Sequence, residues 1–208
     1  DDVESRGLGD VYKRQAPAGL TDTAEQGKSE SRSLIESWHG KGRNRYVITP
    51  RFAISCSTEQ LIAAGRLHEQ YPGTYIQTHL SENKDEIDST LSLCPDCQDY
   101  LEVYERARLV TDRSIFGHCI HLSDSECRRL VEAGSVVAHC PTSNLFLGSG
   151  LFDMQQANRV GMQTVLATDI GAGTSFSMLR TMGEAYKVQQ LGGYPMSVFE
   201  SLYKCTLG

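Results

Sequence analysis

The chain has 208 residues, of which 20 are Lys or Arg and 26 are Asp or Glu, so its formal charge is −6 at pH 7. The composition, with 39% apolar and 22% charged residues, excludes a disordered or collagen-like chain and is typical of one globular domain. The basic residues are dispersed and no apolar run approaches the roughly 18 residues of a membrane span, so we expect neither nucleic acid nor a membrane as a partner.

The first 15 residues show neither a helical nor a strand period and resemble translated adaptor sequence, so we predict a non-native or disordered leader over residues 1–15. The domain is predicted over residues 16–208. Its first element is a helix from 21 to about 39, which Gly40 ends. The apolar face of this helix is predicted to contain Leu34, Ile35 and Trp38.

Short β-branched runs then alternate with helical patterns. Strands are predicted at 45–49, 74–78, 114–117, 135–138 and 164–168. Helices are predicted at 58–70, 84–107 with a break near Pro95, 123–133, 153–161, 177–191 and 196–205. This alternation indicates βαβ units in a parallel sheet, and a (β/α) barrel is favoured because no Gly-rich phosphate fingerprint is present. A doubly wound sheet is the alternative.

Seven cysteines form an odd set in a chain without a signal peptide, so we predict reduced thiols in a cytoplasmic protein. Cys94 and Cys97 form a single C-x-x-C pair. Because no second pair stands at zinc-ribbon spacing, we interpret this pair as part of a loop.

An ionisable side chain follows each predicted strand. These residues are Arg51, His79, His118, His139 and Asp169. The carboxyl ends of barrel strands meet at one rim, and a cluster of histidine nitrogens and an aspartate oxygen suits Zn²⁺ or Fe²⁺. The sequence therefore predicts a metal site at this rim. His139 is left open between lining the site and a structural role.

Glu82 stands three residues after His79, where the chain turns from strand into helix. A carboxylate there can take a proton from metal-activated water and pass it to a leaving group. The alternative is a first-turn residue that the helix dipole favours. For Arg51 the alternative to substrate binding is a surface salt bridge.

Five motifs at these strand ends resemble the metal-dependent amidohydrolase superfamily and, within it, the guanine deaminase family. The motifs are TPRF (49–52), QTHLSEN (77–83), GHCIHLSD (117–124), AHCPTSNLFLGSG (138–150) and ATDIGAGTSFSML (167–179). The resemblance covers residues 19–208. It implies an α/β fold that is a partial TIM-like (β/α)₈ barrel, comprising strands 4 to 8 with their helices.

The resemblance also implies an activity, the zinc-dependent hydrolysis of guanine to xanthine and ammonia, in a chain that is a homodimer when intact. Carried over, His79 and Asp169 hold the zinc, and His118 touches the metal or orients its water. Glu82 shuttles the proton, so Glu82, His118 and Asp169 form the catalytic group. The purine is implied to contact Arg51 and Phe52, with His79 and Glu82 also facing it.

The sequence departs from the family in one respect, because it contains no His-x-His pair. The resemblance places that pair on strand 1, so we expect an internal piece of a longer protein that is itself inactive. Two alternatives remain: another amidohydrolase acting on cytosine, a thioadenosine or a chlorinated triazine, or a non-catalytic decayed barrel. The unrelated zinc deaminase fold is excluded, since its H-x-E and P-C-x-x-C signatures are absent.

Three other histidines are assigned no role. His121 is expected on the turn beyond His118, outside the ligand set, and His39 and His68 are expected to face solvent from their helices.

Overall fold

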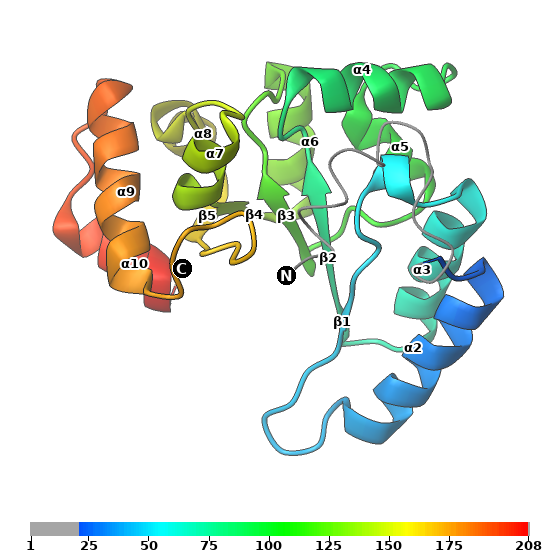
Figure 1. The fold of residues 1–208 in the computed structure, drawn as a ribbon. Coiled ribbons are helices and arrows are strands. Elements are labelled where there is room, and N and C mark those ends of the chain that lie inside the picture. Colours follow the sequence, from blue (N-terminus) through cyan, green and yellow to red (C-terminus); the bar gives the residue numbers. More distant parts are fainter. Residues whose placement is uncertain (1–20, 208) are drawn as a thin grey trace.

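The computed structural model describes residues 21–207, so the predicted leader lies outside the described residues. The fold is a five-stranded parallel sheet whose strands alternate with helices (Figure 1). The strands are β1 (Val47–Ile48), β2 (Tyr75–Leu80), β3 (Ser114–His118), β4 (Val136–His139) and β5 (Gln163–Leu166). All five predicted strands are confirmed, although β1 is only two residues long.

The predicted helices are present with small changes of boundary. They are α2 (Ala24–Trp38), α3 (Thr58–Gln70), α4 (Lys84–Leu93), α5 (Tyr100–Arg106), α6 (Asp124–Ala133), α8 (Met154–Val160), α9 (Met178–Leu191) and α10 (Val198–Thr206). The break near Pro95 separates α4 from α5. The sequence did not predict the short η2 (Ala53–Ser55) or α7 (Pro141–Leu147), because neither is long enough to establish a helical period.

The strands lie side by side in chain order, β1-β2-β3-β4-β5, and every neighbouring pair is parallel. A doubly wound sheet reverses its strand order at a switch point, whereas a barrel does not. The doubly wound alternative is therefore wrong, and the barrel arrangement is confirmed. Helices α2 and α3 flank the β1 end of the sheet, and α9 and α10 flank the β5 end (Figure 1).

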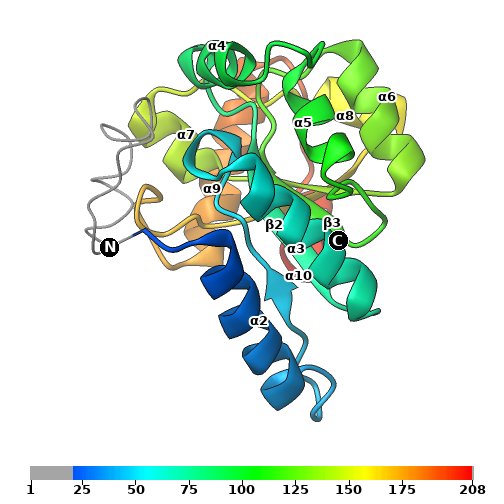
Figure 2. The ribbon, with the colours of Figure 1, turned by 90° about the vertical axis from the view of Figure 1, so that its right-hand side faces the viewer.

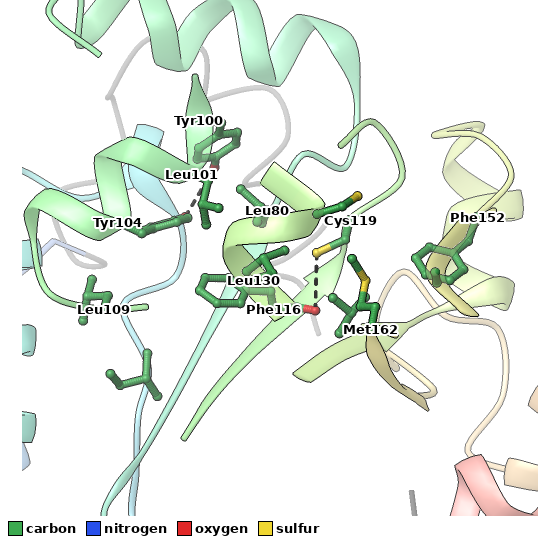
Figure 3. Packing of buried hydrophobic residues seen from close by; sticks show 14 of the residues in the cluster. Leu80, Tyr100, Leu101, Tyr104, Leu109, Phe116, Cys119, Leu130, Phe152 and Met162 are labelled. Atoms are coloured by element: carbon green, nitrogen blue, oxygen red, sulfur yellow. Dashed lines mark hydrogen bonds between the residues drawn. The ribbon is translucent and has the colours of Figure 1, made fainter. Parts of the chain in front are cut away.

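One face of the sheet packs against the helices and holds the core. Figure 3 shows Leu80 and Phe116 from the strands, with Leu101 and Tyr104 from α5 and Leu130 from α6. All five side chains are fully buried. At about 1.5–3 kcal/mol for each large buried side chain, this layer is a main source of the fold's stability.

The opposite face of the sheet carries a row of residues in register that includes His79. Register places His79 beside Gly117, Gly117 beside Ala138 and Ala138 beside Val165. Residues in register on parallel strands share a face. His79 therefore points away from the helix-packed core, on the side that surrounds the axis in a closed barrel.

The predicted apolar face of α2 is wrong in part. Only Ile35 is buried, whereas Leu34 and Trp38 are 47% and 56% exposed. Helix α2 packs beside α3 (Figure 2), and Ile35 alone joins a small cluster with Ile48 and Leu67. Among residues 21–207, α2 has too few neighbours to cover a wider apolar stripe.

The prediction that His39 and His68 face solvent is also wrong. Both are half-buried. His39 ends α2 and accepts a hydrogen bond from the Tyr46 backbone N–H at 3.1 Å, and His68 lies 3.0 Å from the Thr74 hydroxyl. Each histidine stands where a helix ends and the chain turns toward a strand, so it meets polar groups there.

No helix within the described range is both long enough and apolar enough to cross a membrane.

Candidate metal and catalytic site

Three candidate metal ligands meet at the carboxyl ends of the strands. His79, His118 and Asp169 offer ligand atoms that all lie within 4.8 Å of one another. The two imidazole rings are stacked with centroids 5.1 Å apart, and His118 Nε2 lies 3.9 Å from Asp169 Oδ2. The sequence placed these histidines directly after their strands, but they lie within the ends of β2 and β3. Asp169 lies in the loop that follows β5.

His79 is held in the tautomer that a metal needs. A carbonyl oxygen only accepts hydrogen bonds, so His79 Nδ1–H must donate to the Arg51 carbonyl, at 2.7 Å. Its Nε2 therefore carries the free lone pair. Burial, together with the neighbouring His118, lowers the pKa of His79 to about 4, so the ring is neutral at pH 7.

His118 is held in the same way by a different partner. Its Nδ1–H donates to Asn144 Oδ1 at 2.9 Å, and the ring is 2% exposed. Nε2 is left with its lone pair on the side of Asp169. Two imidazole nitrogens and one carboxylate form an ordinary donor set for Zn²⁺ or Fe²⁺, so the residues present fit a divalent metal.

Backbone strain is concentrated at this site. Five non-glycine residues in the described chain adopt left-handed backbone conformations, and four of them adjoin the site. These four are Ser81 (φ 50°), His118 (φ 68°), Cys119 (φ 52°) and Asp169 (φ 47°). Such conformations cost free energy and persist only where the surrounding structure enforces them. Here they turn the side chains at the strand ends toward one another.

The loop after β5 fixes Asp169 through a close backbone approach. The Gly173 N–H donates to the Asp169 carbonyl at 2.5 Å, and a Cβ at Gly173 would lie 1.8 Å from the Thr168 carbonyl oxygen. Only glycine fits there. Gly173 is therefore explained by its close approach to the backbone of Thr168 and Asp169.

Glu82 adjoins the candidate ligands and is 7% exposed. Its Oε1 accepts a hydrogen bond from the Ser149 hydroxyl at 3.1 Å and lies 3.6 Å from His118 Nδ1. Helix α4 is capped by Asn83, so Glu82 lies before the helix and not in its first turn. The helix-dipole explanation of Glu82 is therefore wrong, and the carboxylate is placed beside the ligands.

Arg51 and Phe52 line the His79 side of the site. The Phe52 ring centroid is 5.4 Å from that of His79, and the Arg51 guanidinium carbon lies 5.5 Å from the Phe52 centroid. Within residues 21–207, Arg51 forms no salt bridge. Its half-buried guanidinium is available to a ligand.

Two other histidines lie near the strand ends and are not part of the group of His79, His118 and Asp169. His121 lies outside the ligand set, as predicted, and its Nε2–H donates to the Ser149 carbonyl at 2.9 Å. His139 is fully buried, stacks on Phe152 at 4.8 Å and has no hydrogen-bond partner among the described residues. Burial, then the nearby His118 and Lys204, lowers the pKa of His139 to about 3.

Sequence reasoning missed Asn144 and Ser149, which hold His118 and Glu82. A lone Asn or Ser matches no metal-ligand or nucleophile pattern. A usable signal was present: Pro141, two residues after the end of β4, and Gly148, seven residues later, are the start and stop residues of a short helix. Such a helix at the rim brings its polar residues to the site.

Comparison with protein families matches residues 7–208 to the amidohydrolase family. The guanine deaminase of Escherichia coli K12 is 52% identical over 198 residues, which are 95% of this chain and 45% of that protein. The solved structure of E. coli guanine deaminase matches with a TM-score of 0.91 at 51% identity, over 93% of this chain and 45% of the other. A guanine deaminase from C. acetobutylicum, solved with guanine in its active site, matches with a TM-score of 0.87 at 32% identity, over 93% and 48%. The chain thus spans about half the length of these relatives.

Proposed function

The chain belongs to the amidohydrolase family, and from this premise we propose that it provides part of the active site of a guanine deaminase, which hydrolyses guanine to xanthine and ammonia. The observation that carries the proposal is the group formed by His79, His118 and Asp169, with Glu82 beside it. The 52% identity to a guanine deaminase supports the choice of substrate. Activity belongs to a chain of the relatives' length that contains this segment, hereafter the full-length chain.

Zn²⁺ is the metal we propose for this group, because imidazole nitrogens and a carboxylate are its usual ligands. His79 and His118 would bind it through Nε2, since the Nδ1–H of each ring is already donated. Bound zinc supplies a Lewis acid that lowers the pKa of water to about 7. Asp169 contributes the charged ligand and a second acceptor for a proton.

Glu82 is the proposed proton carrier. In the net reaction the oxygen of water bonds to C2 of guanine, the bond from C2 to the exocyclic nitrogen breaks, and ammonia leaves. Glu82 takes one proton from the attacking water and gives it to a ring nitrogen. The second proton leaves the hydroxyl now at C2, is accepted by Asp169 and reaches the departing amine through Glu82 as the bond from C2 to that nitrogen breaks. His118 Nδ1 lies 3.6 Å from Glu82 Oε1 but already donates its N–H to Asn144, so His118 acts as a metal ligand beside the proton carrier.

Arg51 and Phe52 are the proposed purine contacts. The guanidinium is planar and always charged, and it presents two donors that match a purine carbonyl and an adjacent ring nitrogen. The Phe52 ring beside His79 offers an aromatic surface against which a base packs. The C. acetobutylicum relative with guanine in its active site supports this choice of ligand.

A substrate panel tests the proposal on the zinc-loaded full-length chain. Guanine, cytosine, a thioadenosine and a chlorinated triazine are compared by release of ammonia or chloride. We expect kcat/KM for guanine to exceed the others by about 10²-fold or more, because a site that hydrogen-bonds one polar edge discriminates strongly against substrates without it. A higher kcat/KM for any other substrate contradicts the proposal, and absence of turnover supports a decayed barrel.

A further inference from the structure

One short segment contacts both central groups of the site. Asn144 lies in α7, and Ser149 follows the Gly148 that ends this helix. Asn144 Oδ1 accepts the Nδ1–H of His118 at 2.9 Å, and the Ser149 hydroxyl donates to Glu82 Oε1 at 3.1 Å. Asn144 is 1% exposed and Ser149 is 9% exposed, so both contacts are shielded from water.

These contacts close into a circuit. The Ser149 backbone N–H donates to the Asn144 carbonyl at 2.9 Å, and Glu82 Oε1 lies 3.6 Å from His118 Nδ1. His118 therefore connects to Asn144, Asn144 to Ser149, Ser149 to Glu82, and Glu82 back to His118. A shift of either catalytic side chain lengthens a hydrogen bond to the same segment.

The segment is held in place independently of the catalytic groups. Pro141 occupies the first turn of α7 and Gly148 ends the helix in the left-handed conformation, at φ 71°. On the far side, His121 Nε2–H donates to the Ser149 carbonyl at 2.9 Å. These contacts hold the segment in place and involve neither His118 nor Glu82.

The arrangement has a chemical consequence for proton transfer. At 3.6 Å, an imidazole N–H and a carboxylate are close to pairing, which would occupy the carboxylate. Asn144 Oδ1 accepts the hydrogen bond from His118 Nδ1–H, so Glu82 is not drawn into a pair with His118. Ser149 occupies only Oε1, and Glu82 Oε2 has no hydrogen-bond partner within the described part of the chain. One carboxylate oxygen is therefore left for exchange with water and substrate.

We propose that Asn144 and Ser149 are positioning residues that hold His118 and Glu82 apart and leave Glu82 Oε2 available for proton transfer. The inference rests on the proposed function, because turnover is the readout. Asn144 contacts the metal group only through His118, Ser149 contacts Glu82, and neither hydrogen-bonds Arg51 or Phe52, so each acts through its catalytic partner.

A mutant cycle on the zinc-loaded full-length chain tests the role of Ser149. Ser149→Ala is made alone and in a Glu82→Gln background. We expect Ser149→Ala alone to lower kcat by about 10- to 100-fold, the equivalent of one hydrogen bond to a charged group. KM should change by less than about 3-fold, because substrate contacts are untouched. In the Glu82→Gln background, Ser149→Ala should have no further effect on kcat.

The matched control is Ser143→Ala, which removes a buried hydroxyl of the same segment, within α7, that has no hydrogen-bond partner among residues 21–207. It should leave kcat unchanged. A second experiment combines Asn144→Ala with Ser149→Ala. If the contacts form a closed circuit, kcat of the double variant should fall by far less than the product of the two single fold-losses. Thermal unfolding and zinc content check that each variant is folded and loaded, and the Ser149 cycle decides alone if Asn144→Ala does not fold.

Two outcomes overturn the proposal: an equal loss from Ser149→Ala in both backgrounds, or a loss from Ser143→Ala as large as that from Ser149→Ala. The proposed function fails separately, when wild type does not use guanine. The same cycle is then measured with the substrate that wild type does use. If no substrate is turned over, both proposals fail.

Discussion

The properties of the site are set at the level of single hydrogen bonds. His79 and His118 each donate Nδ1–H to an oxygen from another element, and these two contacts leave the Nε2 lone pair of each ring free in a group that includes Asp169. The residue types His, Glu and Asp at strand ends were enough to predict the group. Their partners were not identified, because a backbone carbonyl has no sequence signature and the Pro141 and Gly148 signal locates the short helix without singling out Asn144 or Ser149.

Arg51 provides a test of recognition. Arg51→Ala in the full-length chain should lower kcat/KM for guanine, with a loss of transition-state stabilisation of about 2–4 kcal/mol. The reason is that a polar edge of the purine is left unpaired in a buried site. Arg51→Lys should restore little of this loss, because a point charge does not reproduce the planar fork. Steady-state kinetics of the two variants provide the measurement. Wild-type kinetics in Arg51→Lys would show that the guanidinium does not bind the base.

His139 provides a test of pH dependence. Its folded pKa of about 3 lies below the ordinary value of 6.5, so between these values the unfolded state binds more protons and stability falls as pH decreases. The loss approaches about 1.4 kcal/mol per pH unit. His139→Leu removes this titration, so urea unfolding at pH 7 and pH 5 should show a smaller difference for the variant. If the free energy of unfolding changes equally between pH 7 and pH 5 in wild type and His139→Leu, then His139 does not cause the loss of stability.

At the level of elements, the sequence predicted what periodicity and composition encode. The β-branched runs gave five strands in the observed order, and Pro95 gave the break between α4 and α5. Two kinds of detail were missed. The length of β1 depends on pairing with β2 alone, and α7 is shorter than two turns, so neither leaves a clear pattern. Helix α7 nevertheless contributes Asn144, and Ser149 directly follows its C-cap, so this short segment holds both catalytic side chains.

The loop after β5 gives a prediction at this scale. Gly173→Ala should destabilise the fold by about 1–3 kcal/mol and weaken zinc binding, because its Cβ would overlap the Thr168 carbonyl and displace Asp169. The matched control is Gly183→Ala in α9, where a Cβ meets nothing within 4 Å. That change should stabilise by about 0.5–1 kcal/mol. The free energy of unfolding and the affinity for zinc are measured for both variants. Equal values for Gly173→Ala and Gly183→Ala would contradict the claim that Gly173 is needed to position Asp169.

At the level of the whole molecule, β1 and β5 are the edge strands of the sheet. Among residues 21–207, each pairs with one neighbouring strand and has no partner on its other side. The row of His79, Gly117, Ala138 and Val165 lies on the face that surrounds the axis in a closed barrel. Sequential strand order and the helix-packed core followed from the alternation of strands and helices. Further metal ligands could not be predicted in the same way. The family resemblance implies a His-x-His pair, and these 208 residues contain none.

This gives a prediction for the 208-residue chain by itself. With the His-x-His pair absent, His79, His118 and Asp169 should bind zinc weakly, and guanine turnover should not be detectable. Metal analysis after dialysis against a weak chelator should find well under one zinc per chain. Retention of one tightly bound zinc per chain contradicts this expectation and shows that three side chains suffice.

The most direct test of the central claim separates Glu82 from the ligands beside it. Glu82→Gln in the full-length chain keeps the size and hydrogen bonding of the side chain but removes its ability to carry a proton. Zinc content should stay near one per chain while kcat for guanine falls by about 10²–10⁴-fold. In the comparison variant Asp169→Asn, zinc and kcat should fall together. Loss of zinc in Glu82→Gln, or an unchanged kcat, would contradict the role assigned to Glu82 and with it the proposed mechanism.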